Sequence, residues 1–182
     1  MGKKITPEDY SRLAIKYGYP EKRVKAVDKV ESNGNGFSEK TGRIIIQFEP
    51  SWFKRNKSDW LKDTKNTFWQ ANKVSDQTEE WKAFNSAFAS DPNAAMKSTS
   101  IGRMQVMGFH YKLLGFSTVG AMWDFAKESE ANQLELGLIF IKKNPALHKA
   151  MLTGNAASFA YNYNGELYRK YDYDNRLIKA GF

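Results

Sequence analysis

The sequence contains no cysteine and only two histidines, His110 and His148, among its 182 residues. Disulfides, cysteine nucleophiles and cysteine metal sites are therefore excluded, and so is a histidine-rich metal cluster. Neither histidine lies in a recognisable nucleophile motif, which leaves serine–histidine–aspartate catalysis without a visible basis. We therefore expect chemistry that needs neither a metal ion nor a cofactor.

Long apolar runs are also missing, because no stretch approaches the roughly 20 residues that a membrane-spanning helix needs. The first seven residues include two lysines, but no apolar segment follows them, so no signal peptide is expected. The sequence thus predicts a protein that stays in the cytoplasm where it is made until something else releases it. No repeat or low-complexity linker divides residues 1–182, and this length suits one domain.

Positive charge is in excess: the formal net charge is +8 and the pI is near 9.5. This balance favours a polyanionic partner such as nucleic acid, a membrane surface or an anionic cell wall, although it can also serve solubility alone. No recognition helix or RNA-binding signature is visible, so we do not expect a nucleic-acid partner. We expect a monomer.

The first candidate for chemistry is Glu31, at the end of an amphipathic helix predicted over residues 21–31. It follows Val27 by one helical turn and Val24 by two, so it lies on the apolar stripe. The Asn-Gly-Asn-Gly run at 33–36 ends this helix. Burial and the negative end of the helix dipole both raise the pKa of such a carboxyl group, which suits a general acid. The alternative is an ordinary solvated glutamate in a last helical turn.

The second candidate is Glu49, eighteen residues further along the chain. Three consecutive isoleucines at 44–46 predict a short buried strand over 44–49, which Pro50 limits. A loop at 37–43 could fold Glu49 back opposite Glu31, and two facing carboxylates are the minimal equipment of a glycosidase. Glu49 is equally compatible with a buried acid paired to an arginine or lysine.

The predicted fold class is mainly α, with one small β-hairpin or sheet around residues 37–49. Capping residues and apolar spacing predict the helices. The predicted helices span 7–17, 21–31, 77–89, a short segment from 92, 119–129, 130–141, 145–152 and 172–180. The helix at 130–141 is the most apolar and is expected to be central. Residues 51–78 are rich in tryptophan and lysine. This stretch predicts a loose helix over 58–71 or a flap whose aromatic rings contact sugars, bases or the core.

Several short motifs together resemble the N-acetylmuramidase domain of bacteriophage endolysins. They occur in the family's order and extend over most of the chain. They are Val-Glu-Ser with a Gly-rich continuation (30–36), Phe-Glu (48–49), Ser-x-Gly-x-x-Gln-x-Met-Gly-Phe (100–109), Glu-Ser-Glu-x-x-Gln-Leu (128–134), Tyr-Asn-Gly (163–165) and Tyr-Asp followed by a basic-Leu pair (173–177). The chain departs from the family pattern at Arg103, where an aromatic or apolar residue is common, and over 54–80. It also leaves no room for the separate wall-binding domain that many relatives carry.

The resemblance implies an α+β lysozyme-like fold. It also implies hydrolysis of the β-1,4 bond between N-acetylmuramic acid and N-acetylglucosamine in bacterial peptidoglycan, leading to lysis of the cell. Glu31 would be the general acid, and Glu49 would stabilise the transition state, activate water or act as nucleophile. The expected glycan contacts are Ser100, Gln105, Tyr163 and Asn164, although Gln105 could equally be a hydrogen-bonded core residue. Two alternatives stay open: a lytic transglycosylase that uses Glu31 alone, and a peptidoglycan-binding module without activity.

Overall fold

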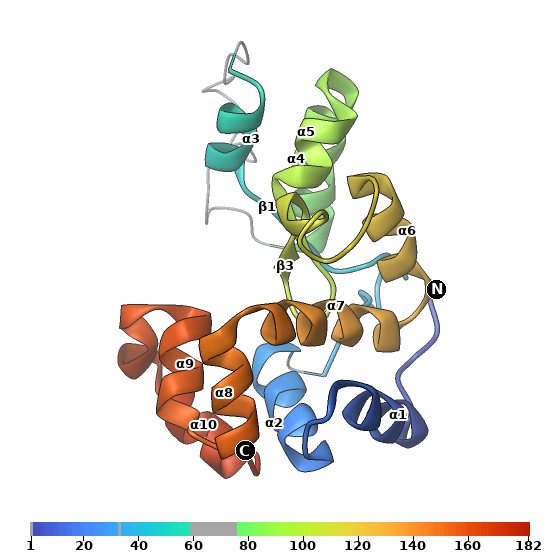
Figure 1. Ribbon diagram of the computed structural model, residues 1–182. Coiled ribbons are helices and arrows are strands. Elements are labelled where there is room, and N and C mark those ends of the chain that lie inside the picture. Colours follow the sequence, from blue (N-terminus) through green and yellow to red (C-terminus); the bar gives the residue numbers. More distant parts are fainter. Residues whose placement is uncertain (1, 33, 59–75) are drawn as a thin grey trace.

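The structure is a computed structural model that describes residues 2–32, 34–58 and 76–182 (Figure 1). Most of the described chain is helical, and three short strands form one antiparallel sheet, so the predicted fold class is confirmed. The elements are α1 (Pro7–Tyr17), α2 (Glu21–Ser32), β1 (Ile46–Phe48), α3 (Pro50–Asn56), α4 (Gln77–Ser90), α5 (Pro92–Lys97), β2 (Thr99–Ile101), β3 (Val106–Met107), the 3-10 turn η2 (Gly108–His110), α6 (Val119–Glu128), α7 (Glu130–Lys143), α8 (Pro145–Thr153), α9 (Ala156–Asn164), the 3-10 turn η3 (Glu166–Tyr171) and α10 (Tyr173–Lys179). The loose helix predicted over 58–71 falls almost wholly outside the described residues.

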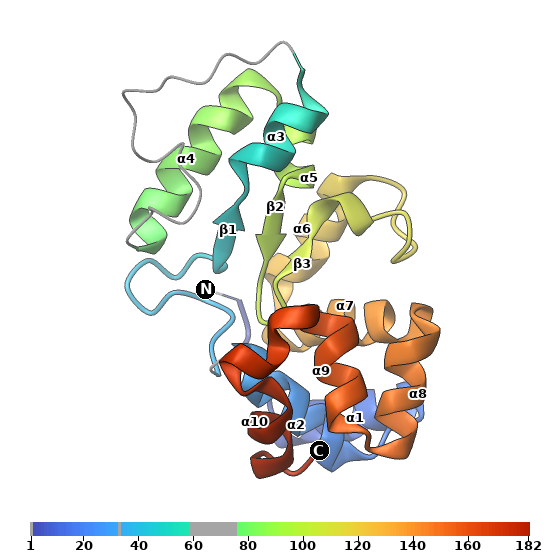
Figure 2. The same cartoon turned by 90° about the vertical axis from the view of Figure 1, so that its left-hand side faces the viewer.

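Helix α7 lies between two parts of the molecule. On one side are α1, α2 and α8 to α10, and on the other are the sheet and α3 to α6 (Figures 1 and 2). Leu134, Leu138 and Ile141 of α7 are completely buried, as the apolar stripe predicts. Gly137 lets the turn after β2 approach closely, because a Cβ atom there would lie 2.5 Å from Cγ of Met104. The helix therefore fixes the sheet to the helical part of the molecule.

Most helices begin directly after a capping residue. Side chains of Thr6, Asp76, Asp91, Thr118, Ser129, Asn144 and Asn155 accept hydrogen bonds from the first-turn backbone N–H groups of the helices that follow them. These bonds satisfy donors that have no partner inside the helix. Within the described ranges, no helix combines the length and apolarity needed to cross a bilayer.

The sheet has the strand order β1–β2–β3, with both pairs antiparallel. Ile46 pairs with Ile101 and Phe48 with Thr99, so the partner of β1 comes from about fifty residues later in the chain. The strand predicted over 44–49 is present as β1, whereas the local hairpin expected around 37–49 is formed only as an isolated bridge between Phe37 and Ile44. Strands β2 and β3, which form a hairpin, were not predicted.

The other edge of β1 is covered by side chains of α4 in place of a strand. Gln77 donates to the carbonyl of Ile46 at 2.8 Å and accepts from its N–H at 2.9 Å. Glu80 accepts from the N–H of Phe48 at 3.0 Å. These contacts satisfy the free backbone groups of β1 and hold its end, where Glu49 lies, in a defined position.

Candidate active site around Glu31 and the hairpin

Glu31 is the penultimate residue of α2, whose inner face is formed by the buried residues Val24, Val27 and Val30. Its side chain is partly buried, in agreement with its place on the apolar stripe. Burial disfavours the charged carboxylate and raises the pKa of Glu31 to about 7. The group is therefore divided between its protonated and ionised forms near neutral pH.

Two residues from the C-terminal helices oppose this effect of burial. The side-chain amide of Asn164, at the end of α9, donates a hydrogen bond to Oε1 of Glu31 over 3.4 Å, which lowers the carboxyl pKa. The positive charge of Arg176 on α10 acts in the same direction. Arg176 is held in place by a 3.0 Å hydrogen bond that it donates to the carbonyl of Val30. The pKa of about 7 is the balance of these contributions.

Glu49 lies directly after β1 and caps the start of α3 with its backbone in an extended conformation. Its N–H donates to the carbonyl of Ser98 at 2.9 Å, which ties it to the segment leading into β2. Burial raises the pKa of Glu49, and a 2.9 Å hydrogen bond from Nε2 of Gln47 opposes the rise by stabilising the carboxylate. Among the described contacts no lysine or arginine pairs with Glu49, in contrast to the alternative of a buried acid paired to a basic residue.

Ser100 and Gln105 belong to the hairpin made by β2 and β3. The hydroxyl of Ser100 donates to Oε1 of Gln105 at 2.8 Å, and Nε2 of Gln105 donates to the carbonyl of Gly102 at 2.8 Å. Gln105 has φ of +45°, a left-handed conformation that costs a non-glycine residue about 1 kcal/mol or more. Ser100 is buried, and its hydroxyl holds the side chain of the more exposed Gln105.

A cavity of about 180 Å³ lies beside this hairpin and is bounded by both polar and aromatic groups. Its lining residues are Met104, Gln105, Val106, Met107, His110, Phe140 and Tyr163. Tyr163 of α9 donates its hydroxyl to the carbonyl of Met104 at 3.0 Å and stacks on Phe159. Burial, together with the negative charge of Glu31, raises the pKa of Tyr163 well above its ordinary value, so its hydroxyl stays protonated.

The six predicted site residues fall into two groups joined by backbone and side-chain contacts. Tyr163 and Asn164 are neighbours on α9, and Asn164 contacts Glu31 directly. On the sheet side, Gln47 pairs with Ser100 in the strand register and donates to Glu49. The bond from Tyr163 to Met104, next to Gln105, links the two groups.

Two residues of this arrangement, Gln47 and Arg176, were not predicted. Gln47 is the exposed residue between buried Ile46 and buried Phe48, and this alternation was a usable signal that its side chain lies on the open face. Arg176 approaches Glu31 across 145 residues of sequence, and no local pattern indicates such a contact.

Comparison with known proteins agrees with this geometry. The sequence profile of the N-acetylmuramidase family matches residues 20–181. The crystal structure of the Burkholderia AP3 phage endolysin superposes with a TM-score of 0.88 at 31% sequence identity. That match covers 98% of this chain and 69% of the endolysin. A search of curated protein sequences finds no match. The chain therefore belongs to the N-acetylmuramidase family, whose members are glycoside hydrolases that act on peptidoglycan.

Proposed function

We propose that the protein cleaves the β-1,4 bond between N-acetylmuramic acid and N-acetylglucosamine, with Glu31 as the general acid. The observation that carries this proposal is the partly buried position of Glu31 at the end of α2, with its pKa raised to about 7. An exposed glutamate with a pKa near 4.3 is more than about 99% ionised at pH 7 and has almost no proton to give. Glu31 keeps its proton in a large fraction of molecules and can protonate the leaving oxygen.

Glu49 is proposed as the second carboxylate of the reaction. Its hydrogen bond from Gln47 favours the ionised form, which is the form that stabilises an oxocarbenium-like transition state, activates water or attacks the sugar. The distance between the two carboxyl groups during the reaction decides among these roles. A separation of about 5–5.5 Å gives retention of configuration, and about 6.5–9.5 Å leaves room for a water molecule and gives inversion.

The glycan strand is proposed to run between α9 and the β2–β3 hairpin. Tyr163 and Asn164 contact it from one side, and Gln105, oriented by Ser100, contacts it from the other. Aromatic rings pack on the apolar faces of sugars, while amides hydrogen-bond to hydroxyl and N-acetyl groups. The net charge of +8 would attract the protein to an anionic envelope, and release from the cytoplasm to the wall would lead to lysis of the cell.

Mass spectrometry of the fragments released from purified sacculi tests this function. A hydrolase of the proposed specificity releases muropeptides that end in reducing N-acetylmuramic acid. A lytic transglycosylase would release 1,6-anhydro ends, and an inactive binding module would release nothing. Either of these last two results would overturn the proposal.

A further inference from the structure

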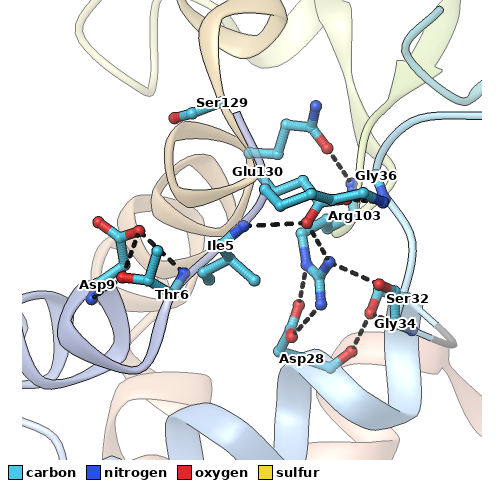
Figure 3. A network of polar contacts seen from close by, with 12 residues as sticks. Ile5, Thr6, Asp9, Asp28, Ser32, Gly34, Gly36, Arg103, Ser129 and Glu130 are labelled. Atoms are coloured by element: carbon cyan, nitrogen blue, oxygen red, sulfur yellow. Dashed lines mark hydrogen bonds and ion pairs between the residues drawn. The ribbon is translucent and has the colours of Figure 1, made fainter. Parts of the chain in front are cut away.

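Three charged side chains are buried together beneath the loop that follows Glu31. Asp28 comes from α2, Arg103 from the turn between β2 and β3, and Glu130 from the start of α7 (Figure 3). Their exposed fractions are 2%, 3% and 1%. Residues that are far apart in the sequence therefore meet at one point, where the helical part and the sheet part of the molecule join.

Arg103 is bound by its full set of side-chain nitrogens. Its Nε and one terminal nitrogen donate to the two carboxylate oxygens of Asp28, and the other terminal nitrogen lies 3.1 Å from Oε2 of Glu130. The backbone N–H of Arg103 also donates to Oε1 of Gln133 at 3.0 Å. The planar, forked guanidinium allows this arrangement, which the single ammonium of a lysine cannot reproduce.

The same cluster holds the loop at 34–36 at two points. The terminal nitrogen of Arg103 that faces Glu130 also donates to the carbonyl of Gly34 at 2.9 Å, and Oε1 of Glu130 accepts from the N–H of Gly36 at 3.0 Å. Gly36 has no room for a side chain, because a Cβ atom there would lie 2.8 Å from Cγ of Arg103. The path of the loop from α2 toward β1 is thus set by these two side chains (Figure 3).

A third attachment lies between this cluster and Glu31 itself. Ser32, the residue after Glu31, donates to the carbonyl of Asp28 at 2.6 Å and accepts from the N–H of Gly34 at 2.9 Å. Glu31 therefore lies between Asp28, which Arg103 binds, and Gly34, which Arg103 also binds. Rotation of the last turn of α2 would break the contacts of Arg103 with Asp28 and with Gly34.

We propose that Arg103 is a positioning residue for Glu31: by binding Asp28, Gly34 and Glu130 together, it fixes the end of α2 relative to the β2–β3 hairpin. This inference rests on the proposed function of Glu31. Apolar residues of similar volume often stabilise a fold as well as a buried ion cluster does, so stability alone does not account for this one. Arg103 also precedes Met104, whose carbonyl binds Tyr163, so one turn supports both the acid and the proposed glycan contact.

The consequence for catalysis follows from the surroundings of Glu31. The described charged and titratable groups that act on it are Arg176 from α10 and Tyr163 from α9, and the Asn164 amide contacts it from α9. Burial is the largest influence on its proton affinity. If the end of α2 loosens, water reaches the carboxyl group, the pKa of Glu31 falls toward its ordinary value, and the acid is no longer aligned with the leaving oxygen.

The substitution Arg103→Lys tests the proposal, measured on solubilised peptidoglycan fragments well below the melting temperature. We expect kcat at pH 7 to fall between about tenfold and a hundredfold, with little change in KM. The alkaline limb of the kcat–pH profile should move down by about one pH unit. Glu130→Gln, which keeps the shape and one acceptor but removes a charge, should shift the limb in the same direction by less. It keeps the test possible if Arg103→Lys does not fold.

The matched control is Glu135→Gln. Glu135 is also nearly buried on α7 and bonds to Lys16 at 2.6 Å and Tyr17 at 2.8 Å, but its bonds are to α1 and do not reach the loop at 34–36. The substitution Glu135→Gln should lower the free energy of unfolding and leave the shape of the kcat–pH profile unchanged. If folded Arg103→Lys and Glu130→Gln both keep the wild-type profile and kcat, the positioning role is wrong even where Glu31→Gln abolishes activity. If Glu31→Gln stays active, the proposed function itself has failed.

Discussion

The side-chain amide of Asn164 donates to Oε1 of Glu31 over 3.4 Å, which joins the end of α9 to the end of α2 across 133 residues of sequence. This bond stabilises the ionised carboxylate, yet burial outweighs it and the pKa of Glu31 is raised to about 7. The pKa of Glu31 is therefore set by opposing influences that can be changed one at a time.

The pH dependence of activity should reflect both carboxyl groups. A general acid must be protonated, so kcat should fall as pH rises through about 7, the pKa of Glu31. Glu49 must be ionised, and because its pKa is raised, activity should also fall at acidic pH. A kcat–pH profile on soluble fragments measures both limbs. Activity that is unchanged from pH 6 to pH 9 would contradict the role of Glu31.

Removal of the positive charge of Arg176 on α10 should move the alkaline limb of the kcat–pH profile to higher pH. Arg176 lowers the pKa of Glu31, so Arg176→Gln should let the acid keep its proton to a higher pH. Lys179→Gln is the matched control, because Lys179 lies on the same helix and is exposed. The kcat–pH profiles of the two variants are compared. A limb that moves downward in Arg176→Gln, or moves equally in both variants, would argue against this electrostatic coupling.

Folding stability should depend on pH through Glu31 in a defined direction. The pKa of Glu31 in the folded state is raised above the ordinary value of 4.5. Its contribution to the free energy of unfolding is therefore full below about pH 4.5 and is lost as pH rises to about 7. Glu31→Gln removes this loss and should be more stable than the wild type at pH 8 by about 2–3 kcal/mol. At pH 4 the two should be similar. Urea denaturation at both pH values measures the difference, and an equal gap at both would contradict the assignment.

The possible roles of Glu49 predict different losses of turnover for Glu49→Gln. If Glu49 only stabilises the transition state by its charge, turnover should fall by about 10²–10³-fold. If it is the base or nucleophile, turnover should be lost about as completely as in Glu31→Gln. Gln47→Leu, which removes the hydrogen bond to Glu49 alone, should have a smaller effect in the same assay. Near-normal turnover of Glu49→Gln would remove Glu49 from the mechanism.

Much of the helical fold could be predicted because its signals are local. Thr6 with Pro7, and Asp91 with Pro92, mark helix starts by capping and by the fixed backbone of proline, and the structure confirms both. The apolar spacing of Leu134, Leu138 and Ile141 indicated the buried central helix in the same way.

Elements that depend on distant partners could not be predicted with the same success. The strand β2 (Thr99–Ile101) exists because it pairs with β1, about fifty residues away, and its own residues have no strand-like alternation. Helices α3 and α9 were also not predicted, since the aromatic residues of α3 and the Tyr-Asn-Tyr-Asn run that ends α9 have lower helix propensity than alanine.

The candidate site shows the same division between local and distant signals. The position of Glu31 on an apolar stripe is a local property and was predicted. The sequence marks Arg103 only as a departure from the family pattern, because nothing near it in the sequence indicates that Asp28 and Glu130 surround it. The remaining site assignments are predictions that the experiments above decide.

The most direct test of the central claim is the amount of reducing N-acetylmuramic acid ends that folded Glu31→Gln releases from purified sacculi, compared with the wild type. Circular dichroism and the denaturation midpoint establish that the variant is folded. Because glutamine cannot supply the proton, we expect release to fall by at least about 10³-fold. Release near the wild-type level from folded Glu31→Gln would contradict the account.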